Sequence, residues 1–284
     1  MNIKHMFDGK INDKMVYGFL IHTILLIGAV IMLLPFVWTV LTSLKPLHEV
    51  TRIPLTIFPE EIKLENYSLA MVTLPFINLY INTFVMIIAR IICAVVFSSM
   101  AGYAFARINF PGSKILFYLV LIQMMVPAQI FLIPQYLIVA KLGLLNSIPA
   151  LIVPGLVSAF GTFLLRQFFK ALPSDLEEAA ILDGCNQWQI YRRVMLPLAG
   201  ASLSALGIFT AVFAWKELMW PLIVNMSMNK MTLSSGLATL IGYYETSYPV
   251  LMASAFIAIW PMLLLFVIFQ KRFVEGIALT GTKG

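Results

Sequence analysis

The side chains that could catalyse a reaction or bind a metal are few in this sequence, and they form no known pattern. There are three histidines, His5, His22 and His48, and two cysteines, Cys93 and Cys185. No His-Glu-x-x-His segment is present, the spacing that puts two zinc-binding imidazoles on one face of a helix. Two cysteines are too few for a cysteine-based metal cluster or a disulfide framework. We therefore predict no catalytic residues and no metal site, and we do not expect an enzyme.

Nucleotide phosphates also lack a recognisable site in the sequence. The Gly-x-x-x-x-Gly-Lys-Ser/Thr loop, whose backbone amides cradle phosphates, is absent. The segment Gly112-Ser113-Lys114 is only a fragment of that loop and sits beside a turn. We expect this chain to bind no cofactor of its own.

Three charged residues lie inside long apolar stretches: Arg90, Lys216 and Glu217. An arginine at the centre of a membrane costs about 2.5–3.5 kcal/mol on insertion scales, so it has to pair, snorkel or face water. We predict a pairing role for Arg90 and treat direct substrate contact as the weaker alternative. Lys216 and Glu217, with Trp215 beside them, are candidates for positions along a substrate pathway.

The composition places these residues in a membrane protein. Of the 284 residues, 61% are hydrophobic and 11% are charged, whereas soluble domains have about 45–50% and about 25%. A soluble fold has too little charge here to cover its surface, and a disordered chain would be far less apolar. The apolar runs do not alternate with period two, which disfavours a β-barrel. The sequence therefore predicts an all-α integral membrane protein.

Six apolar segments are long enough to cross a bilayer as helices, which takes about 20 residues each. They cover residues 15–41, 77–104, 115–138, 148–168, 199–224 and 249–270. This division leaves an N-terminal tail over 1–14 and a C-terminal tail over 271–284, with the six-helix domain over 15–270. Prolines within the spans are either simply tolerated or break the helices to line a cavity or form a hinge.

The basic residues predict the orientation of the spans. With both termini in the cytoplasm, cytoplasmic segments hold 12 of the 19 Lys and Arg residues, external segments five, and the spans two. The positive-inside rule favours this orientation, and it accounts for the net charge of +6 without nucleic acid as a partner. By helical rise, Arg90 lies about 21 Å beyond Phe76, past the midplane. Glu217 lies about 28 Å beyond Pro197, near the external mouth.

The cytoplasmic segment 167–198 is the least loop-like of the connections. Ser174 with Glu177, and Asn186 with Gln189, have the spacing of capping boxes that open two short helices. Gly184 supplies the backbone freedom needed where the first helix ends. On physical grounds alone, the helix pair either lies on lipid headgroups or projects into the cytoplasm as a lever.

This segment resembles the EAA loop of ATP-binding-cassette importer permeases. The matching residues are Glu178-Ala179-Ala180, then Gly184 after three residues, then Val194-Met195-Leu196-Pro197 after nine more. Other stretches resemble carbohydrate-importer permeases: Ala101 to Arg107 with Phe110-Pro111-Gly112, Val126-Pro127-Ala128-Gln129, and Trp215 to Leu218 with Pro221-Leu222. Lys216 stands where that family usually has asparagine. The resemblance covers nearly the whole chain and is closest to the maltose-type second permease subunit.

The resemblance implies an importer permease fold in the cytoplasmic membrane of a bacterium or archaeon. The implied partners are a second permease subunit in a heterodimer, two ATP-binding subunits that hold ATP and Mg²⁺, and an extracellular solute-binding protein that delivers a sugar. It also implies that six residues couple the chain to the ATPase: Glu178, Ala179, Ala180, Asp183, Gly184 and Pro197. Tyr243 and Tyr244 are candidates for contact with the binding protein, an aromatic belt at the membrane interface being the alternative.

An ion-coupled secondary transporter of small polar solutes is the alternative function. Such a protein is expected to show inverted repeats and acidic residues at the midplane, and neither is evident in the sequence. We therefore expect the permease subunit of an ATP-driven importer for a sugar or oligosaccharide, which couples ATPase closure to alternating access.

Overall fold

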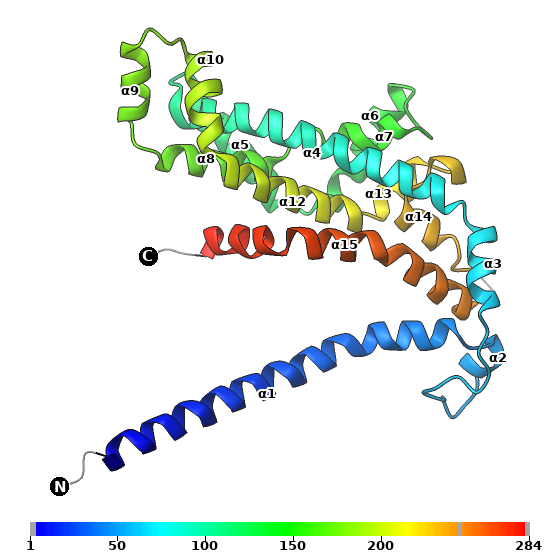
Figure 1. Cartoon of the computed structure of the whole chain (residues 1–284). Helices are drawn as coiled ribbons and strands as arrows, with labels where there is room; N and C mark the ends of the chain where they lie inside the picture. Colours follow the sequence, from blue (N-terminus) through cyan, green and yellow to red (C-terminus); the bar gives the residue numbers. More distant parts are fainter. Residues whose placement is uncertain (1–3, 243–245, 282–284) are drawn as a thin grey trace. The chain divides into compact units, whose positions relative to one another are not determined.

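The computed structural model of the chain is built from helices (Figure 1). It describes residues 4–242 and 246–281, and side chains over 16–242 and 246–270. The helices in this part of the chain are α1 (Lys4–Ser43), α2 (Leu47–Val50), α3 (Glu65–Thr73), α4 (Phe76–Arg107), α5 (Ser113–Met125), η1 (Ala128–Phe131), α6 (Leu132–Lys141), α7 (Ile148–Ile152), η2 (Val153–Gly155), α8 (Ala159–Ala171), α9 (Asp175–Leu182), α10 (Gln187–Ile190), η3 (Tyr191–Met195), α11 (Leu196–Leu198), α12 (Gly200–Lys216), α13 (Met219–Val224), η4 (Met228–Lys230), α14 (Leu233–Ala238) and α15 (Tyr248–Gly281). No strand occurs over these residues, so the predicted all-α class is confirmed.

Four stretches are long and apolar enough to cross a membrane, judged by length and composition over the described residues. They are Val16–Ser43, Phe76–Arg107, Ile148–Ala171 and Tyr248–Gln270. These four correspond to the predicted spans 15–41, 77–104, 148–168 and 249–270. Two bent helix pairs bring the number of candidate spans to at most six.

The predicted spans 115–138 and 199–224 are not single straight helices. α5 meets the segment Ala128–Lys141 at an angle of 104°, with Pro127 at the break. Proline has no backbone N–H and forces the preceding residue out of the helical region, and Val126 is accordingly extended. Gln187–Leu198 meets α12 at 76°, and α12 itself ends at Lys216. By contrast, Pro35 and Pro261 lie inside the continuous helices α1 and α15.

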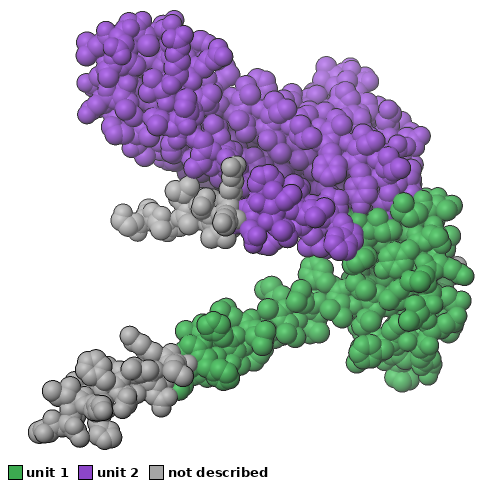
Figure 2. Space-filling view, viewed as in Figure 1, with its two compact units in different colours: residues 1–73, 241–258 green, residues 74–240, 259–284 purple. Residues whose placement is uncertain are grey.

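The chain divides into two compact units, residues 1–73 with 241–258 and residues 74–240 with 259–284 (Figure 2). In the second unit, α4 packs along α8 and α12. A Cβ atom on Gly102 of α4 would lie 2.9 Å from the backbone nitrogen of Arg166 on α8. A Cβ atom on Gly161 of α8 would lie 2.7 Å from Ser98 Oγ on α4. These two glycines therefore allow close contact between the helices.

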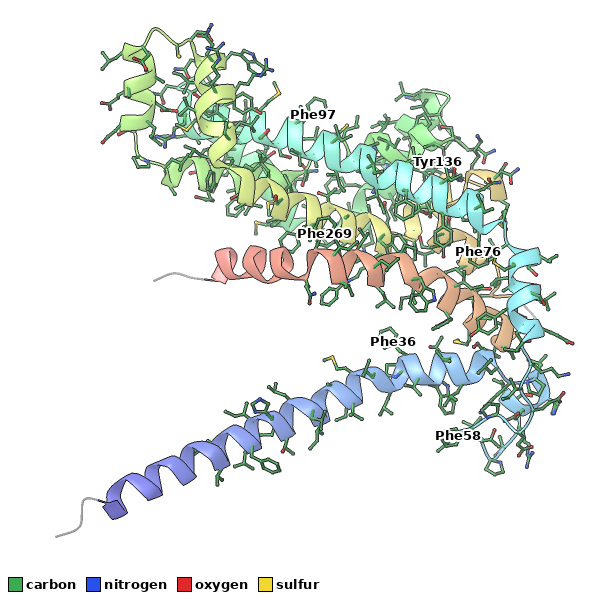
Figure 3. The ribbon with its side chains drawn as sticks, in the orientation of Figure 1. Phe36, Phe58, Phe76, Phe97, Tyr136 and Phe269 are labelled. Carbon is green, nitrogen blue, oxygen red and sulfur yellow. The ribbon has the colours of Figure 1, made fainter. Side chains whose placement is uncertain are left out.

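The first unit contains the apolar helix α1 and the folded segment that follows it. None of the apolar window in Val16–Ser43 is buried within the chain, and Phe36 on this helix is half exposed (Figure 3). After the helix, Lys45 Nζ lies 3.8 Å from Glu49 Oε1, and both side chains are buried. Thr56 Oγ1 and the backbone N–H of Glu60 donate hydrogen bonds to the Glu49 carboxylate. This buried group ties together the segment from 45 to 60.

Candidate functional site

Three interruptions of the helices line one cavity in the second unit. They are the α5–η1 break at Val126, the 3₁₀ turn η2 and the α12–α13 break at Glu217-Leu218. The cavity has a volume of about 470 Å³, and its polar lining consists of Arg90, Gln123, Gln129, Gln135, Lys216 and Glu217. Broken helices around a polar cavity are typical of transporters, because the side chains and freed backbone groups there face water.

Arg90 is fixed in the wall of this cavity by one carboxylate and one carbonyl. It is 7% exposed, and its Nη1 lies 2.5 Å from Glu217 Oε2. Its Nε donates to Leu151 O at 2.8 Å, and its Nη2 donates to the same oxygen. Gly155 provides the space, since a Cβ atom there would lie 2.7 Å from Arg90 Nε. Arg90 therefore has the partner that an arginine inside a span requires.

Pro154 explains why side chains donate hydrogen bonds to backbone carbonyl groups of α7. In a continuous helix the N–H of residue 154 would donate a hydrogen bond to Ala150 O, but this residue is proline and has no N–H. The indole Nε1 of Trp220, a buried residue on α13, donates to Ala150 O at 2.9 Å instead. The next carbonyl, that of Leu151, is the one that Arg90 binds. Two side chains from distant helices thus satisfy the polar groups that the interrupted helix leaves open.

The Arg90–Glu217 contact shows that the two depths predicted from helical rise cannot both be right. Arg90 was expected past the midplane and Glu217 near the external mouth, yet the two side chains touch and so lie at one level. The predicted depth of Glu217 assumes one straight helix from Pro197 onward. The chain bends by 76° just after that residue, so the distance from Pro197 does not all run along the axis of the span. The count to Arg90 started at Phe76, and the 32-residue helix α4 is longer than a span needs.

The structure brings three of the four predicted pathway residues to this cavity. Arg90, Lys216 and Glu217 line it, whereas Trp215 is outside its lining and packs with its ring centroid 6.1 Å from that of Phe84. Lys216 is exposed, and no described residue forms an ion pair or hydrogen bond with its side chain.

Three glutamines of the lining were missed by the sequence analysis. Gln123 and Gln129 stand on either side of the α5–η1 break, and Gln135 follows on α6. Their polarity inside the predicted span 115–138 was the available signal. The 104° bend at Pro127 is what brings them to Arg90 and Lys216, and the sequence does not give its angle.

Five of the six predicted coupling residues lie on or next to the short helix α9. Glu178, Ala179 and Asp183 are exposed, and so is Pro197, which lies in α11 just before the bend into α12. Ala180 alone of this set is buried, at 7% exposed. The exposed residues are accordingly available to a partner.

Gly184 ends helix α9 in a Schellman turn. Cys185 N donates to Ala180 O and Gly184 N donates to Ile181 O, both at 2.9 Å. This pair of bonds requires a left-handed residue after the helix, and Gly184 has φ +80°. The predicted helix end is confirmed.

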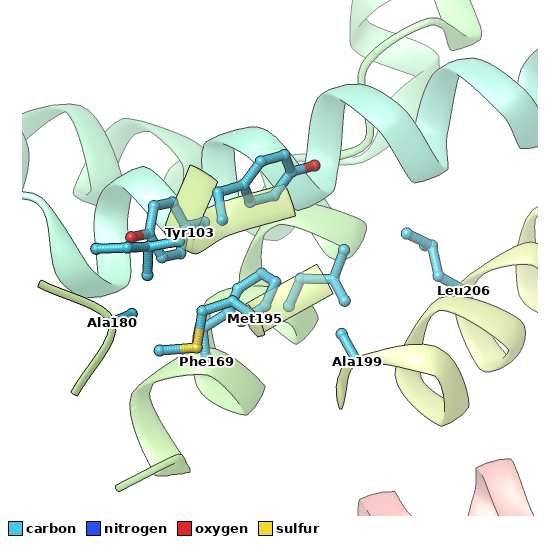
Figure 4. Packing of buried hydrophobic residues seen from close by; sticks show 9 residues of the cluster. Tyr103, Phe169, Ala180, Met195, Ala199 and Leu206 are labelled. Carbon is cyan, nitrogen blue, oxygen red and sulfur yellow. The ribbon is translucent and has the colours of Figure 1, made fainter. Parts of the chain in front are cut away.

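Ala180 packs into a buried cluster at this end of the second unit (Figure 4). Its other members are Tyr103, Leu165, Phe169, Ile190, Tyr191, Met195, Ala199 and Leu206. They come from α4, α8, α10, η3 and α12 and the residue just before α12. The segment 167–198 is thus a folded part of the second unit.

One of the two predicted capping boxes is wrong. Ser174 has helical backbone angles and its side chain caps no backbone amide, because a capping side chain needs an extended backbone. Glu177 Oε2 instead lies 3.8 Å from Arg107 Nη1. The box formed by Asn186 and Gln189 is confirmed, with both of its hydrogen bonds present.

Tyr243 and Tyr244 lie outside the described residues, so their predicted contact stays a prediction. Over the part of the chain that is described, no three His, Cys, Asp or Glu side chains gather closely enough to hold a metal ion.

Comparison with known sequences gives the following matches. A family model described as "Binding-protein-dependent transport system inner membrane component" matches residues 94–278. The chain is 35% identical over 259 residues to the arabinooligosaccharides transport system permease protein AraQ of Halalkalibacterium halodurans, covering 90% of this chain and 93% of that one. It is 29% identical to the diacetylchitobiose uptake system permease protein NgcG of Streptomyces coelicolor, over 90% and 86% of the chains. It is 31% identical to the sn-glycerol-3-phosphate transport system permease protein UgpE of Rhizobium meliloti, over 91% and 95%.

A chain of similar fold is found among solved structures. The crystal structure of a bacterial ABC transporter involved in the import of the acidic polysaccharide alginate contains a similar chain. The TM-score is 0.77 at 22% identity, covering 92% of this chain and 98% of the other.

Proposed function

This chain belongs to the family of binding-protein-dependent transport system inner membrane components, and from that membership we propose how its residues act in import. It is a permease subunit of an ATP-binding-cassette importer embedded in the membrane. We propose that its cargo is a saccharide or a small polyol derivative, because the relatives are named for arabinooligosaccharides, diacetylchitobiose and glycerol-3-phosphate. None of the relatives reported above is named as an ion-coupled transporter, so that alternative gains no support.

The cavity at the three helix breaks is the proposed pathway. The observation that carries this is the set of polar side chains from α4, α5, η1, α6 and α12 that converge on it. Amide groups donate and accept hydrogen bonds, which suits hydroxyl-rich solutes. The rings of Phe131 and Trp220 in the same lining add apolar faces. A lipid-facing hollow has no need of such a lining.

The segment 167–198 is the proposed contact with a separate ATPase subunit. Glu178, Ala179 and Asp183 are exposed on α9 and Gly184 shapes its end, while Ala180 anchors the helix to the buried cluster. A carboxylate such as that of Glu178 suits a charge-assisted bond to a basic partner residue. Closure of the two ATPase subunits on ATP would move α9, and the helices packed around it would switch the cavity between the two sides.

The remaining parts of the proposal concern topology and assembly. Each bent pair counts as one span, which gives six, with both termini cytoplasmic and 167–198 facing the ATPase. A second permease subunit and an extracellular solute-binding protein complete the importer. Hydrolysis of ATP is assigned to the partner subunits.

Thiol labelling of the reconstituted importer tests the pathway. We expect Gln129→Cys, in a chain with Cys93 and Cys185 replaced by serine, to react with a hydrophilic maleimide. Vanadate trapping with ATP should change the rate, because the cavity opens to the other side. A matched control is Leu119→Cys, an exposed apolar position on α5, which lipid should shield. Equal labelling of both positions in both states would contradict the assignment.

A further inference from the structure

We propose that Lys216 gives this importer a preference for an anionic saccharide, one that carries a carboxylate or phosphate group. The inference rests on the proposed function, because it assigns a cargo class to the cavity already proposed as the pathway. It depends on the charges in the lining, on the position of Lys216 and on the partners that each charged group has.

The charges of the lining leave one positive charge without a partner. Arg90 and Glu217 are both charged, but they neutralise each other at 2.5 Å. Leu151 O takes the remaining Arg90 donors, so little of this arginine is available to a solute. The other polar side chains, Gln123, Gln129 and Gln135, are neutral. The lining therefore has a net charge of +1, and Lys216 supplies it.

The position of Lys216 makes its ammonium group available to a solute. It is the last residue of α12, next to the break at Glu217-Leu218. Its side chain is exposed at the cavity, and no described residue neutralises or bonds to it. A lysine in the middle of a membrane protein is costly and is usually paired or faces a polar path. Here Lys216 lines the polar cavity, and its side chain has no partner among the described residues.

An ammonium group binds an anionic oxygen more strongly than a hydroxyl. A charge-assisted hydrogen bond is about twice as strong as a neutral one. The neutral amides around Lys216 can bond the sugar hydroxyls of either cargo equally. Discrimination between an acidic saccharide and its neutral counterpart therefore falls to Lys216.

Acetylation of lysines in the intact importer tests the proposal directly. The complex of both permeases and the ATPases, in nanodiscs without the binding protein, is treated with a water-soluble acetylating reagent, and modified lysines are measured by mass spectrometry. The probes are digalacturonate and glycerol 3-phosphate for the two anionic groups, and galactobiose as the neutral match of digalacturonate. Lys230, exposed and outside the cavity, is the control. We expect at least one acidic probe to slow acetylation of Lys216 about tenfold relative to galactobiose and to leave Lys230 unchanged.

The other outcomes overturn the proposal in distinguishable ways. Protection by galactobiose equal to that by each acidic probe would leave the cavity as the pathway and remove the charge preference. Protection by neither acid with an accessible Lys216 would remove Lys216 from cargo binding. Unreactive Lys216 beside reactive Lys230 would mean that another subunit covers the amine, and Lys216→Gln would then weaken assembly of the complex.

Discussion

At the scale of single residues, two carbonyl groups on α7 determine what Arg90 and Trp220 do. Pro154 leaves Ala150 O without its helical donor, and the indole of Trp220 takes that place. Arg90 binds the neighbouring carbonyl of Leu151 and reaches Glu217 with its other end. Arg90 therefore links three elements, α4, α7 and the α12–α13 break, through one guanidinium group.

Loss of the Glu217 carboxylate should destabilise the chain through this group. In Glu217→Ala, the buried Arg90 keeps its charge and its carbonyl but loses its counter-ion. Removing one partner of a buried pair costs about 3–5 kcal/mol, and the lower end applies because Glu217 is 30% exposed. Thermal unfolding of the purified complex would measure the loss. Glu217→Gln should lose less stability, since the amide oxygen can still accept a hydrogen bond from Arg90.

A double variant separates the charge effect from a packing effect. Arg90→Met with Glu217→Met removes both charges, so we expect it to be more stable than Glu217→Ala. If the double variant were as unstable as the single one, the ion pair would not be the source of the loss.

Replacing Gly184 should uncouple ATP hydrolysis from transport. Gly184 has φ +80°, and no atom lies within 4 Å of where its Cβ would be, so the effect of Gly184→Val comes from backbone strain alone. A left-handed conformation costs an ordinary residue about 1–2 kcal/mol, which should reorient the turn after α9. We expect solute uptake to fall in proteoliposomes while ATPase activity persists. Gly184→Asn, which tolerates this conformation, should keep both activities; normal transport by Gly184→Val would contradict the coupling role.

At the scale of elements, the sequence predicts where apolar helices occur better than where they bend. The spans 77–104 and 249–270 match α4 and α15 because long apolar runs directly reflect the thickness of a bilayer. The polar cavity was not predicted as a unit, since Arg90 and Glu217 are 127 residues apart and no local pattern pairs them. The wrong prediction of a capping box at Ser174 has a similar origin, because Glu177 lies beside Arg107, a residue on another helix.

The segment between α1 and α3 should lose order in acid. Burial alone raises the pKa of Glu49, but hydrogen bonds from Thr56 and Glu60 and the charge of Lys45 outweigh it, so the pKa lies below its usual 4.5. The stabilisation is therefore complete above the usual pKa and is lost as the pH falls through the lowered one. Hydrogen-exchange protection of residues 45–60, measured relative to the intrinsic exchange rate at each pH, should fall in that acid range.

Two variants check that Glu49 is responsible. Glu49→Gln should speed exchange of the same residues already at neutral pH and reduce its dependence on acid. Glu61→Gln alters an exposed pair with Lys63 and should change little. Unchanged exchange in Glu49→Gln would show that the buried carboxylate does not hold this segment.

At the scale of the whole molecule, the exposed apolar surface indicates that lipid or other subunits surround the chain. The window in Val16–Ser43 has no buried share, and Phe97 on α4 is also exposed (Figure 3). Such side chains need lipid or a second subunit around them. An importer permease paired with another permease in a bilayer meets that need.

Cysteine accessibility in cells tests the six-span arrangement. In a chain with its two natural cysteines replaced, we expect single cysteines at Glu61 and Ser227 to react with an impermeant maleimide in intact cells. Cysteines at Gly112 and Asp183 should react only after the inner membrane is permeabilised. Labelling of Asp183→Cys from outside would mean that the orientation is the reverse of the proposed one and that segment 167–198 cannot contact the ATPase.

The glycine contacts between α4 and α8 imply that the permease is mechanically stiff. The backbone of Arg166 leaves no room for a Cβ atom at Gly102, and the side chains of Ser98 and Leu206 leave none at Gly161. Cores packed this closely tend to switch between arrangements rather than deform gradually. Movement at α9 should then tilt α4, α8 and α12 together. Incomplete closure of the ATPases should therefore leave the cavity closed to the other side of the membrane. Tight packing at two small residues would in this way keep solute from leaking through an idle importer.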